Sequence, residues 1–341
     1  MSTLHDVASV AGVSVTTASR VLRGKASALV SMATSERVKD AAEQLGYRAS
    51  AAARALVTGR AQTVALCCHR AYDPDLARIL RLTHNLVHEA GYHLMVVAQD
   101  TTAEVSALLR EQRADAVIWT RYPVHEADAL GDSLGAPHQV IIAIGEIADG
   151  GPQRAFSGVW EDREGMRRAL EHLVGLGHGR VAYLGGLGGD SKQLAFEQAC
   201  ADLSLDGVVI AGAGEADRLA AGAAMARQVL KLRERPTALV ARNDDFAIGA
   251  LHALREAGLI LPGDMSVIGY DDTPGAGYAA PPLTSVRTPG EEALQALLPP
   301  ALAALDHDPD EREAPLHMRF EVALSVRKST GPPRGNPSGK G

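Results

Sequence analysis

The stretch GVSVTTASRVLRG, residues 12–24, decides how the chain begins to fold. Its first two residues, Gly-Val, form a short turn between segments whose apolar residues recur at helical spacing. Ser14 is a good N-cap for the second segment, because its hydroxyl can accept a hydrogen bond from an unpaired backbone N–H of the first turn. Gly24 stands where a helix often ends in a left-handed residue. We therefore expect a helix over 15–23.

Two further helices flank this one. Residues 4–11 repeat apolar side chains at helical spacing, and residues 31–45 do so again before Gly46. Three short helices within the first fifty residues, with a glycine turn between the first two, are typical of a helix-turn-helix domain.

The central helix has two different faces. Ala18, Val21 and Leu22 share one face by their spacing, whereas Thr16 and Arg20 point the opposite way. The apolar face can pack on the neighbouring helices. The polar face is then left free to enter the major groove of DNA.

The side chains of the free face are able to read bases. Arg20 can donate two hydrogen bonds to a guanine edge, Val15 can pack on a thymine methyl group, and Thr16 can do either. The alternative from this helix alone is an ordinary surface helix with an exposed arginine.

Charge is distributed unevenly along the 341 residues. Residues 1–60 hold eight Lys and Arg against four acids, a net charge of +4. Because the whole chain has a net charge of −7, the other 281 residues have a net charge of −11. A small basic unit on an acidic body is the layout expected when one part of a protein contacts a polyanion.

The remaining chain indicates an α/β fold. Short apolar runs alternate with amphipathic helical segments, which favours parallel sheets covered on both faces. We expect an N-terminal three-helix head, a hinge, and two Rossmann-like α/β subdomains with a cleft between them. The expected strands lie at TVALCC (63–68), HLMVVAQ (93–99), ADAVIWT (114–120), QVIIAIG (139–145), RVAYLGG (180–186), GVVIAG (207–212), TALVAR (237–242) and MSVIGYDD (265–272).

The first fifty residues also resemble a known family. TLHDVASVAGVSVTTASRVLRG, followed by VS, T, ERV and AAEQLGY, within residues 3–47, is similar to the DNA-binding head of lactose-repressor/galactose-repressor type transcription regulators. The resemblance implies that Val15, Thr16 and Arg20 are the base-reading residues. It also implies phosphate contacts by Ser14, Thr17, Ser19, Ser31 and Thr34.

The resemblance extends to the linker. Residues 51–56 favour a helix by composition, but so short a helix is marginally stable alone. In the family such hinge helices form on DNA and wedge leucines into the minor groove, and Leu56 is the matching residue, with Ala53 beside it as a DNA contact.

The body is similar to the same family over residues 241–289 and 171–186, which are of the periplasmic-binding-protein type. The resemblance implies that Asn243 and Asp271 hydrogen-bond a small-molecule effector in the cleft, with Asp73 also facing it. Polar groups at strand ends agree with this, because open α/β sheets bind ligands there.

One position differs from the sugar-binding members. Lys192 stands before Phe196 where those members carry arginine, and lysine offers a point charge rather than a planar fork. The effector is therefore left open, with a sugar or sugar derivative as one candidate. Asp244 and Asp272 also follow strands, but acids in such positions often cap helices.

Several classes of protein are excluded. The start lacks a secretory pattern and no apolar run is long enough to span a membrane, so we expect a cytoplasmic protein without membrane contact. GGLGGD (185–190) fails the dinucleotide fingerprint, and twelve scattered histidines and three cysteines match neither a metal nor a redox spacing. We expect buried free thiols, no metal, no cofactor and no enzymatic activity.

These observations predict a homodimeric transcription regulator that binds a palindromic operator in double-stranded DNA under control of an effector. Repression is the favoured mode of regulation. The alternatives are a solute receptor without DNA regulation and a cleft enzyme of the same fold. Whether the effector releases or promotes DNA binding stays open. The expected boundaries are 1–48 for the head, 49–61 for the hinge, 62–328 for the two-lobed body and 329–341 for a disordered tail.

Overall fold

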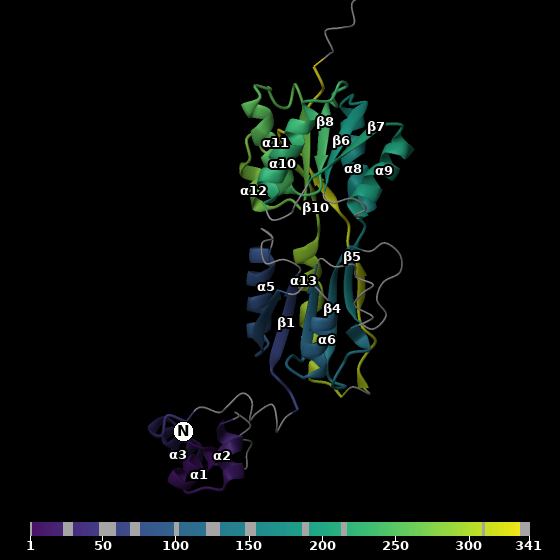
Figure 1. The fold of residues 1–341 in the computed structure, drawn as a ribbon. Helices are drawn as coiled ribbons and strands as arrows, with labels where there is room; N and C mark the ends of the chain where they lie inside the picture. Colours follow the sequence, from purple (N-terminus) through teal and green to yellow (C-terminus); the bar gives the residue numbers. More distant parts are fainter. Residues whose placement is uncertain are drawn as a thin grey trace, which may run out of the picture. The chain divides into compact units, whose positions relative to one another are not determined.

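The computed structural model describes residues 2–22, 30–47, 59–68, 76–98, 102–120, 130–146, 155–185, 191–212, 217–308 and 311–334. It divides into a head unit that ends at Gln62 and a body unit that begins at Thr63 (Figure 1).

The head unit is built from three helices, α1 (Leu4–Ala11), α2 (Val15–Leu22) and α3 (Met32–Gln44). All three predicted helices are confirmed over their described residues, while Gly24 lies outside them. The core consists of small and β-branched apolar side chains that the helices share: Val7, Ala8, Ala11, Ala18, Val21, Val38, Ala41 and Ala42.

Both ends of α1 are fixed locally. Thr3 Oγ1 accepts a hydrogen bond from Asp6 N–H, and the Asp6 carboxylate accepts one from Thr3 N–H, which is a capping box. At the other end Gly12 has φ +65°, a conformation that glycine adopts without steric cost. The chain therefore turns sharply into α2, as the sequence predicts.

The first lobe of the body is a parallel sheet in the order β11-β5-β4-β3-β1-β2. Its described helices are α5 (Leu76–Glu89), α6 (Thr102–Arg110) and α13 (Gly290–Leu305). Its strands are β1 (Thr63–Cys68), β2 (His93–Ala98), β3 (Ala116–Thr120), β4 (Val140–Glu146), β5 (Phe156–Trp160) and β11 (His317–Arg319).

The second lobe has a sheet in the order β12-β10-β9-β8-β6-β7, in which β12 alone runs antiparallel to its neighbour among the described strands. Its strands are β6 (Arg180–Gly185), β7 (Asp206–Ala211), β8 (Ala238–Ala241), β9 (Ser266–Tyr270), β10 (Thr284–Arg287) and β12 (Ala323–Ser325). Its helices are α8 (Asp162–Gly175), α9 (Ser191–Leu203), α10 (Arg218–Val229), α11 (Asp244–Glu256) and α12 (Pro274–Tyr278).

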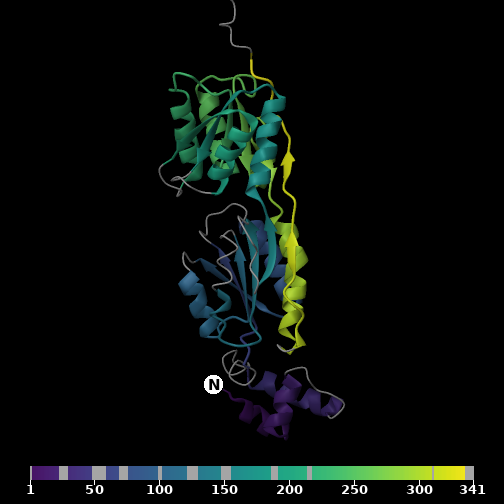
Figure 2. The same cartoon turned by 90° about the vertical axis from the view of Figure 1, so that its right-hand side faces the viewer.

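The chain passes between the two lobes at three places: from β5 to α8, from β10 to α13, and from β11 to β12. Figure 2 shows the last passage in yellow. Four strands next to these passages, β5, β10, β11 and β12, are absent from the sequence prediction. All four are short, which weakens any pattern in the sequence, and β11 and β12 also lie at sheet edges, where burial imposes little pattern.

The predicted disordered tail is wrong over its first six residues. The Ser329 hydroxyl accepts a hydrogen bond from Thr284 N–H at 2.8 Å, and His178 Nε2 lies 3.0 Å from the carbonyl oxygen of Gly331. Arg334 pairs with Asp264 at 3.0 Å. These contacts fix residues 329–334 against the second lobe, and the rest of the predicted tail lies outside the described residues.

All three cysteines are free and buried, as predicted. Burial raises the pKa of Cys67 and of Cys200 to about 12, so neither thiol is reactive near neutral pH. Within the described ranges, no helix is both long and apolar enough to cross a bilayer.

The contact between α10 and α11 yields a stability prediction. A Cβ atom on Gly222 would lie less than 3.0 Å from the Phe246 carbonyl oxygen, which is backbone and cannot rotate away. We expect Gly222→Ala to destabilise the body by about 1–3 kcal/mol, as overpacking does, in urea unfolding. Gly175→Ala is the matched control, because no atom lies within 4 Å of its Cβ position and α8 ends there. Equal stability of the two variants would contradict the packing argument.

Candidate functional site

The outer face of α2 presents the side chains that the sequence assigns to base reading. Thr16 and Arg20 are exposed, and Val15 keeps 41% of its surface exposed although it is apolar. On the opposite face Ala18 and Val21 are buried in the head core. The predicted division of this helix into a packed face and a free face is therefore confirmed.

Hydroxyl pairs cap two helices of the head. Ser14 Oγ accepts from Thr17 N–H at 3.1 Å and lies 2.8 Å from the Thr17 hydroxyl. Ser31 and Thr34 repeat this arrangement at α3, with distances of 3.2 and 2.9 Å. Hydroxyls at the positive end of a helix dipole suit contacts with anions such as phosphate.

The remaining predicted DNA and effector contacts are Ser19, Ala53, Leu56 and Asp73. Ser19 is half-buried on α2. Ala53, Leu56 and Asp73 lie outside the described residues.

Two of the four predicted effector residues contact each other at the carboxyl edge of the second sheet. Lys192 Nζ on α9 lies 3.3 Å from Asp271 Oδ1, and both side chains are largely buried, with 17% and 9% exposed. The ammonium also donates to the Arg242 carbonyl oxygen at 3.2 Å and lies 3.8 Å from the centre of the Tyr270 ring. A cation is thus fixed at this edge by a carboxylate, a carbonyl and an aromatic face.

The aromatic residue four positions after Lys192 has a different role. Phe196 is buried and its ring stacks on Tyr183 at 5.3 Å between centroids. Tyr270 supplies the aromatic face instead, and its hydroxyl donates to the buried Asp162 carboxylate at 2.8 Å. Phe196 therefore belongs to the core, and Tyr270 is a site residue that the sequence analysis did not identify.

The third predicted effector residue, Asn243, is the N-cap of α11. Its side-chain oxygen accepts from Phe246 N–H at 3.0 Å, and 8% of its surface is exposed. Because the cap occupies the carbonyl oxygen, the amide NH₂ is the group that Asn243 can offer to a ligand.

Asp244 is fully buried and holds two neighbouring segments together, whereas a helix-capping role was the alternative from sequence. It accepts hydrogen bonds from Thr273 N–H at 2.6 Å, from the Thr273 hydroxyl at 2.9 Å and from the Ser285 hydroxyl at 2.6 Å. The pKa of Asp244 is raised to about 7: burial is the largest cause and the nearby Asp271 carboxylate adds to it, while the hydrogen bonds from Ser285 and Thr273 oppose the rise.

The turn that carries Asp271 has an unusual backbone. Asp271 and Asp272 follow β9 with φ of 94° and 52°, a left-handed region in which non-glycine residues are uncommon. Asp272 is fastened by Arg327 at 2.7 Å and by the Ser325 hydroxyl at 2.7 Å. A Cβ on Gly269 would lie less than 3.0 Å from Asp244 Oδ1, so glycine is required where this turn begins.

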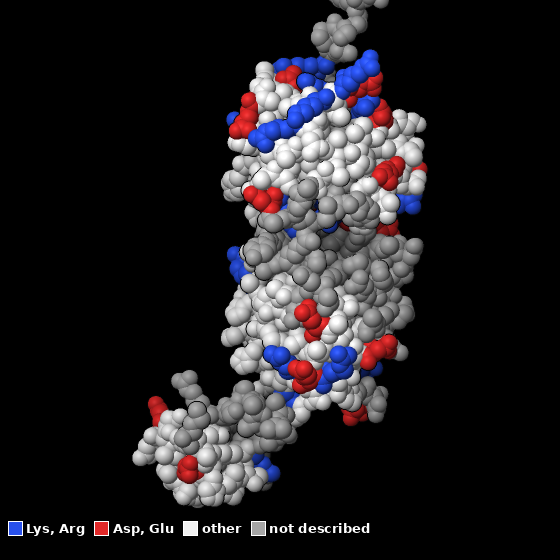
Figure 3. Space-filling view, viewed as in Figure 1, with Lys and Arg blue, Asp and Glu red and all other residues white. Residues whose placement is uncertain are grey.

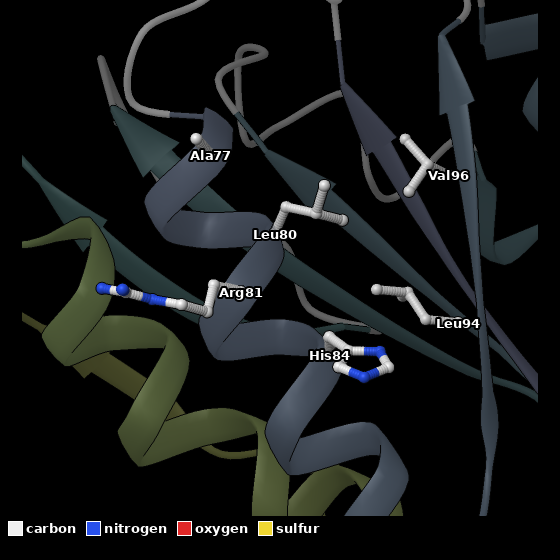
Figure 4. Close-up of a pocket in the computed structure, with 6 residues that line it drawn as sticks. All are labelled: Ala77, Leu80, Arg81, His84, Leu94 and Val96. Atoms are coloured by element: carbon white, nitrogen blue, oxygen red, sulfur yellow. The ribbon is translucent and has the colours of Figure 1, made fainter.

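An apolar cavity of about 450 Å³ lies elsewhere, on the first lobe (Figure 4). It lies between α5 and the edge strand β2, where Val96 keeps 45% of its surface exposed. The residues that line it are Ala77, Leu80, Arg81, His84, Leu94 and Val96.

The second lobe also exposes apolar side chains. Tyr278 on α12 is 91% exposed and Leu219 on α10 is 48% exposed. On the face of the second lobe seen in Figure 3, an area without charged side chains lies below a row of Lys and Arg side chains. Each lobe therefore exposes some apolar side chains.

Family models match both parts of the chain. Residues 3–50 match the model of bacterial regulatory proteins of the lacI family, and residues 170–330 match that of a periplasmic binding protein-like domain.

Curated relatives and solved structures agree with these matches. The chain is 31% identical to the HTH-type transcriptional repressor PurR of Haemophilus influenzae over 317 residues, which cover 87% of this chain and 90% of the relative. It is similar to the Lac repressor dimer bound to operator and the anti-inducer ONPF, with a TM-score of 0.79, 25% identity and coverage of 97% and 99%. It is also similar to a CelR–cellobiose complex, with a TM-score of 0.65, 25% identity and coverage of 96% and 100%.

Asp244 should make the stability of the body depend on pH. Because the folded pKa of about 7 exceeds the ordinary 3.8, the folded state holds the proton more tightly, and the free energy of unfolding falls as pH rises from about 4 to 7. We expect Asp244→Asn to remove this loss of stability. In urea unfolding, the free energy of unfolding of the variant should rise relative to that of the wild type by up to about 4 kcal/mol between pH 4 and 8.

Asp202→Asn serves as the control, since Asp202 is an exposed acid on α9. The argument fails if both variants show the pH dependence of the wild type.

Proposed function

The chain belongs to the lacI family of bacterial regulatory proteins and is a transcriptional regulator rather than an enzyme, and we propose that it represses transcription by binding operator DNA as a homodimer under control of a small-molecule effector. The observation that carries this proposal is the exposed face of α2 on a head that matches the family. A solute receptor does not account for that face. Because a bacterial transcriptional regulator acts on DNA in the cell interior, we propose that this protein is cytoplasmic.

In this proposal the head contacts DNA in two ways. Val15, Thr16 and Arg20 read base edges in the major groove, because they are the exposed side chains of α2. The hydroxyl pairs at the starts of α2 and α3, together with Ser19, contact phosphates and set the register of the head. Residues 49–61 act as the hinge, with Ala53 and Leu56 contacting the minor groove.

A second copy of the chain is the occupant we propose for the apolar groove between α5 and β2. One head covers a half-site, so a palindromic operator needs two heads related by a two-fold axis. The groove lies beside the edge strand β2. An exposed apolar surface at a sheet edge favours association with another chain. The apolar side chains of α10 and α12 extend this interface to the second lobe.

The effector binds, in this proposal, at the carboxyl edge of the second sheet. In this site Lys192 and the amide of Asn243 donate hydrogen bonds to the effector, and the Asp271 carboxylate accepts hydrogen bonds from it. A sugar hydroxyl can both donate and accept, so it matches this mixed set. CelR is solved with cellobiose and a regulator of Enterococcus faecium with ribose, which supports a sugar or sugar derivative. Asp73 is a further contact in this proposal.

The experiment that tests the proposed function combines both sites. An operator is selected from random DNA with the purified protein, and ribose and cellobiose are then titrated with and without saturating operator. Coupling between two sites is reciprocal, so an effector that changes operator affinity has its own affinity changed by the same factor. Failure to select any palindromic sequence would overturn the proposal.

Arg20→Ala should lose discrimination at one base pair. We expect affinity for the selected operator to fall about 5- to 150-fold, equivalent to 1–3 kcal/mol, while affinity for random DNA changes much less. Arg37→Ala, which removes another exposed arginine, from α3, is the control for loss of charge. An equal loss on all sequences would instead make Arg20 a phosphate contact.

Val96→Arg should dissociate the dimer. The substitution places a charge on the edge strand at the groove, where two copies would bring two such charges together. Light scattering should give the mass of one chain, about 36 kDa, for this variant at concentrations where the wild type has the mass of two chains. Val174→Arg changes a similarly exposed valine on α8 and should remain dimeric, and a dimeric Val96→Arg would exclude the groove as the interface.

A further inference from the structure

Asp244 is bonded to the turn that carries Asp271 and to the neighbouring strand β10. Through Thr273 it holds the residue two positions after Asp271, and through Ser285 it holds the neighbouring strand β10. Ser285 Oγ in turn accepts from Asp272 N–H at 3.1 Å. One buried carboxylate thus fixes the second half of this turn, directly at Thr273 and through Ser285 at Asp272.

From this geometry we propose that Asp244 is a positioning residue of the effector site, and that its protonation changes how Asp271 pairs with Lys192. The proposal deepens the effector site described above and rests on it for its biological meaning. Asp244 is buried behind the site, so it acts through the turn and not by contact with the ligand.

The chemistry of the hydrogen bonds explains the effect of a proton. The ionised carboxylate accepts three hydrogen bonds and needs no acceptor of its own. The protonated acid must donate one, and Ser285 Oγ would then accept from both the acid and Asp272 N–H, which leaves the Ser285 proton without its partner. The bonds that fix the turn are therefore rearranged when Asp244 gains a proton.

The surrounding charges leave Asp244 as the group that responds. Lys192, from α9, pairs with Asp271, and Arg327, which follows β12, pairs with Asp272. Among the described residues, the groups that donate to Asp244 are one N–H and two hydroxyls. They balance its negative charge less well than Lys192 and Arg327 balance those of Asp271 and Asp272. The pKa of Asp244, raised to about 7, places the change near neutral pH.

The Lys192–Asp271 pair gives a direct readout in the ligand-free protein. The full-length chain is produced with lysine labelled with ¹³C at Cε, and the signal of Lys192 is assigned by its loss in Lys192→Arg. We expect the wild-type signal to show an inflection between about pH 6 and 8, as Asp244 titrates. In Asp244→Asn this inflection disappears.

Two further variants make the test specific. Asp272→Asn removes an acid of the same turn that is paired with Arg327, and the inflection should persist. Ser285→Ala retains Asp244 but deletes a bond that lowers its pKa, so the inflection should move to higher pH. This variant also decides the matter if Asp244→Asn fails to fold.

The proposal is overturned if the wild-type signal has no inflection in this range, if the inflection persists in Asp244→Asn, or if Ser285→Ala leaves its midpoint unchanged. Because no ligand is added, these results are independent of the proposed function. If the inflection behaves as expected but the protein selects no operator, the positioning role of Asp244 stands and the proposed regulatory function is rejected.

Discussion

The parallel order of β8, β9 and β10 is the constraint on which the effector site depends. Neighbouring parallel strands end at one edge, so residues that follow β8 and β9 meet there although almost thirty positions separate Asn243 from Asp271. The polar groups at this edge then need partners because they are buried. Asp244 supplies them for the turn, and Lys192 supplies one for Asp271. The bonds that satisfy these buried polar groups therefore also position the residues of the effector site.

Local patterns in the sequence account for the head and for most of the sheets. Helical spacing and the Ser14 cap are local signals, so α1, α2 and α3 agree with their predicted ranges. The buried strands β1, β3, β4, β6, β8 and β9 are mostly apolar and were predicted. The short strands β5 and β10, and the edge strands β11 and β12 of three residues each, were not predicted. The exposed face of α2 follows from the same spacing, since its opposite face is apolar.

Contacts between distant residues account for what the sequence did not predict. Asp244 meets Ser285 across 41 positions, and Ser329 meets Thr284 across 45, so no local pattern marks either pair. Residues rich in Gly and Pro read as a disordered tail because composition carries no information about a buried partner. Tyr270 was missed for a similar reason, since its contact with Lys192 depends on where α9 lies on the sheet.

The three passages of the chain between the lobes have a consequence for biosynthesis. The first lobe takes β11 from residues 317–319, and the second takes β12 and residues 329–334, so neither sheet is complete until almost the whole chain has been translated. The three helices of the head are complete after residue 47 and contact one another locally. During translation the N-terminal unit can fold first. A nascent chain thus acquires the ability to recognise DNA long before it acquires the domain that controls it.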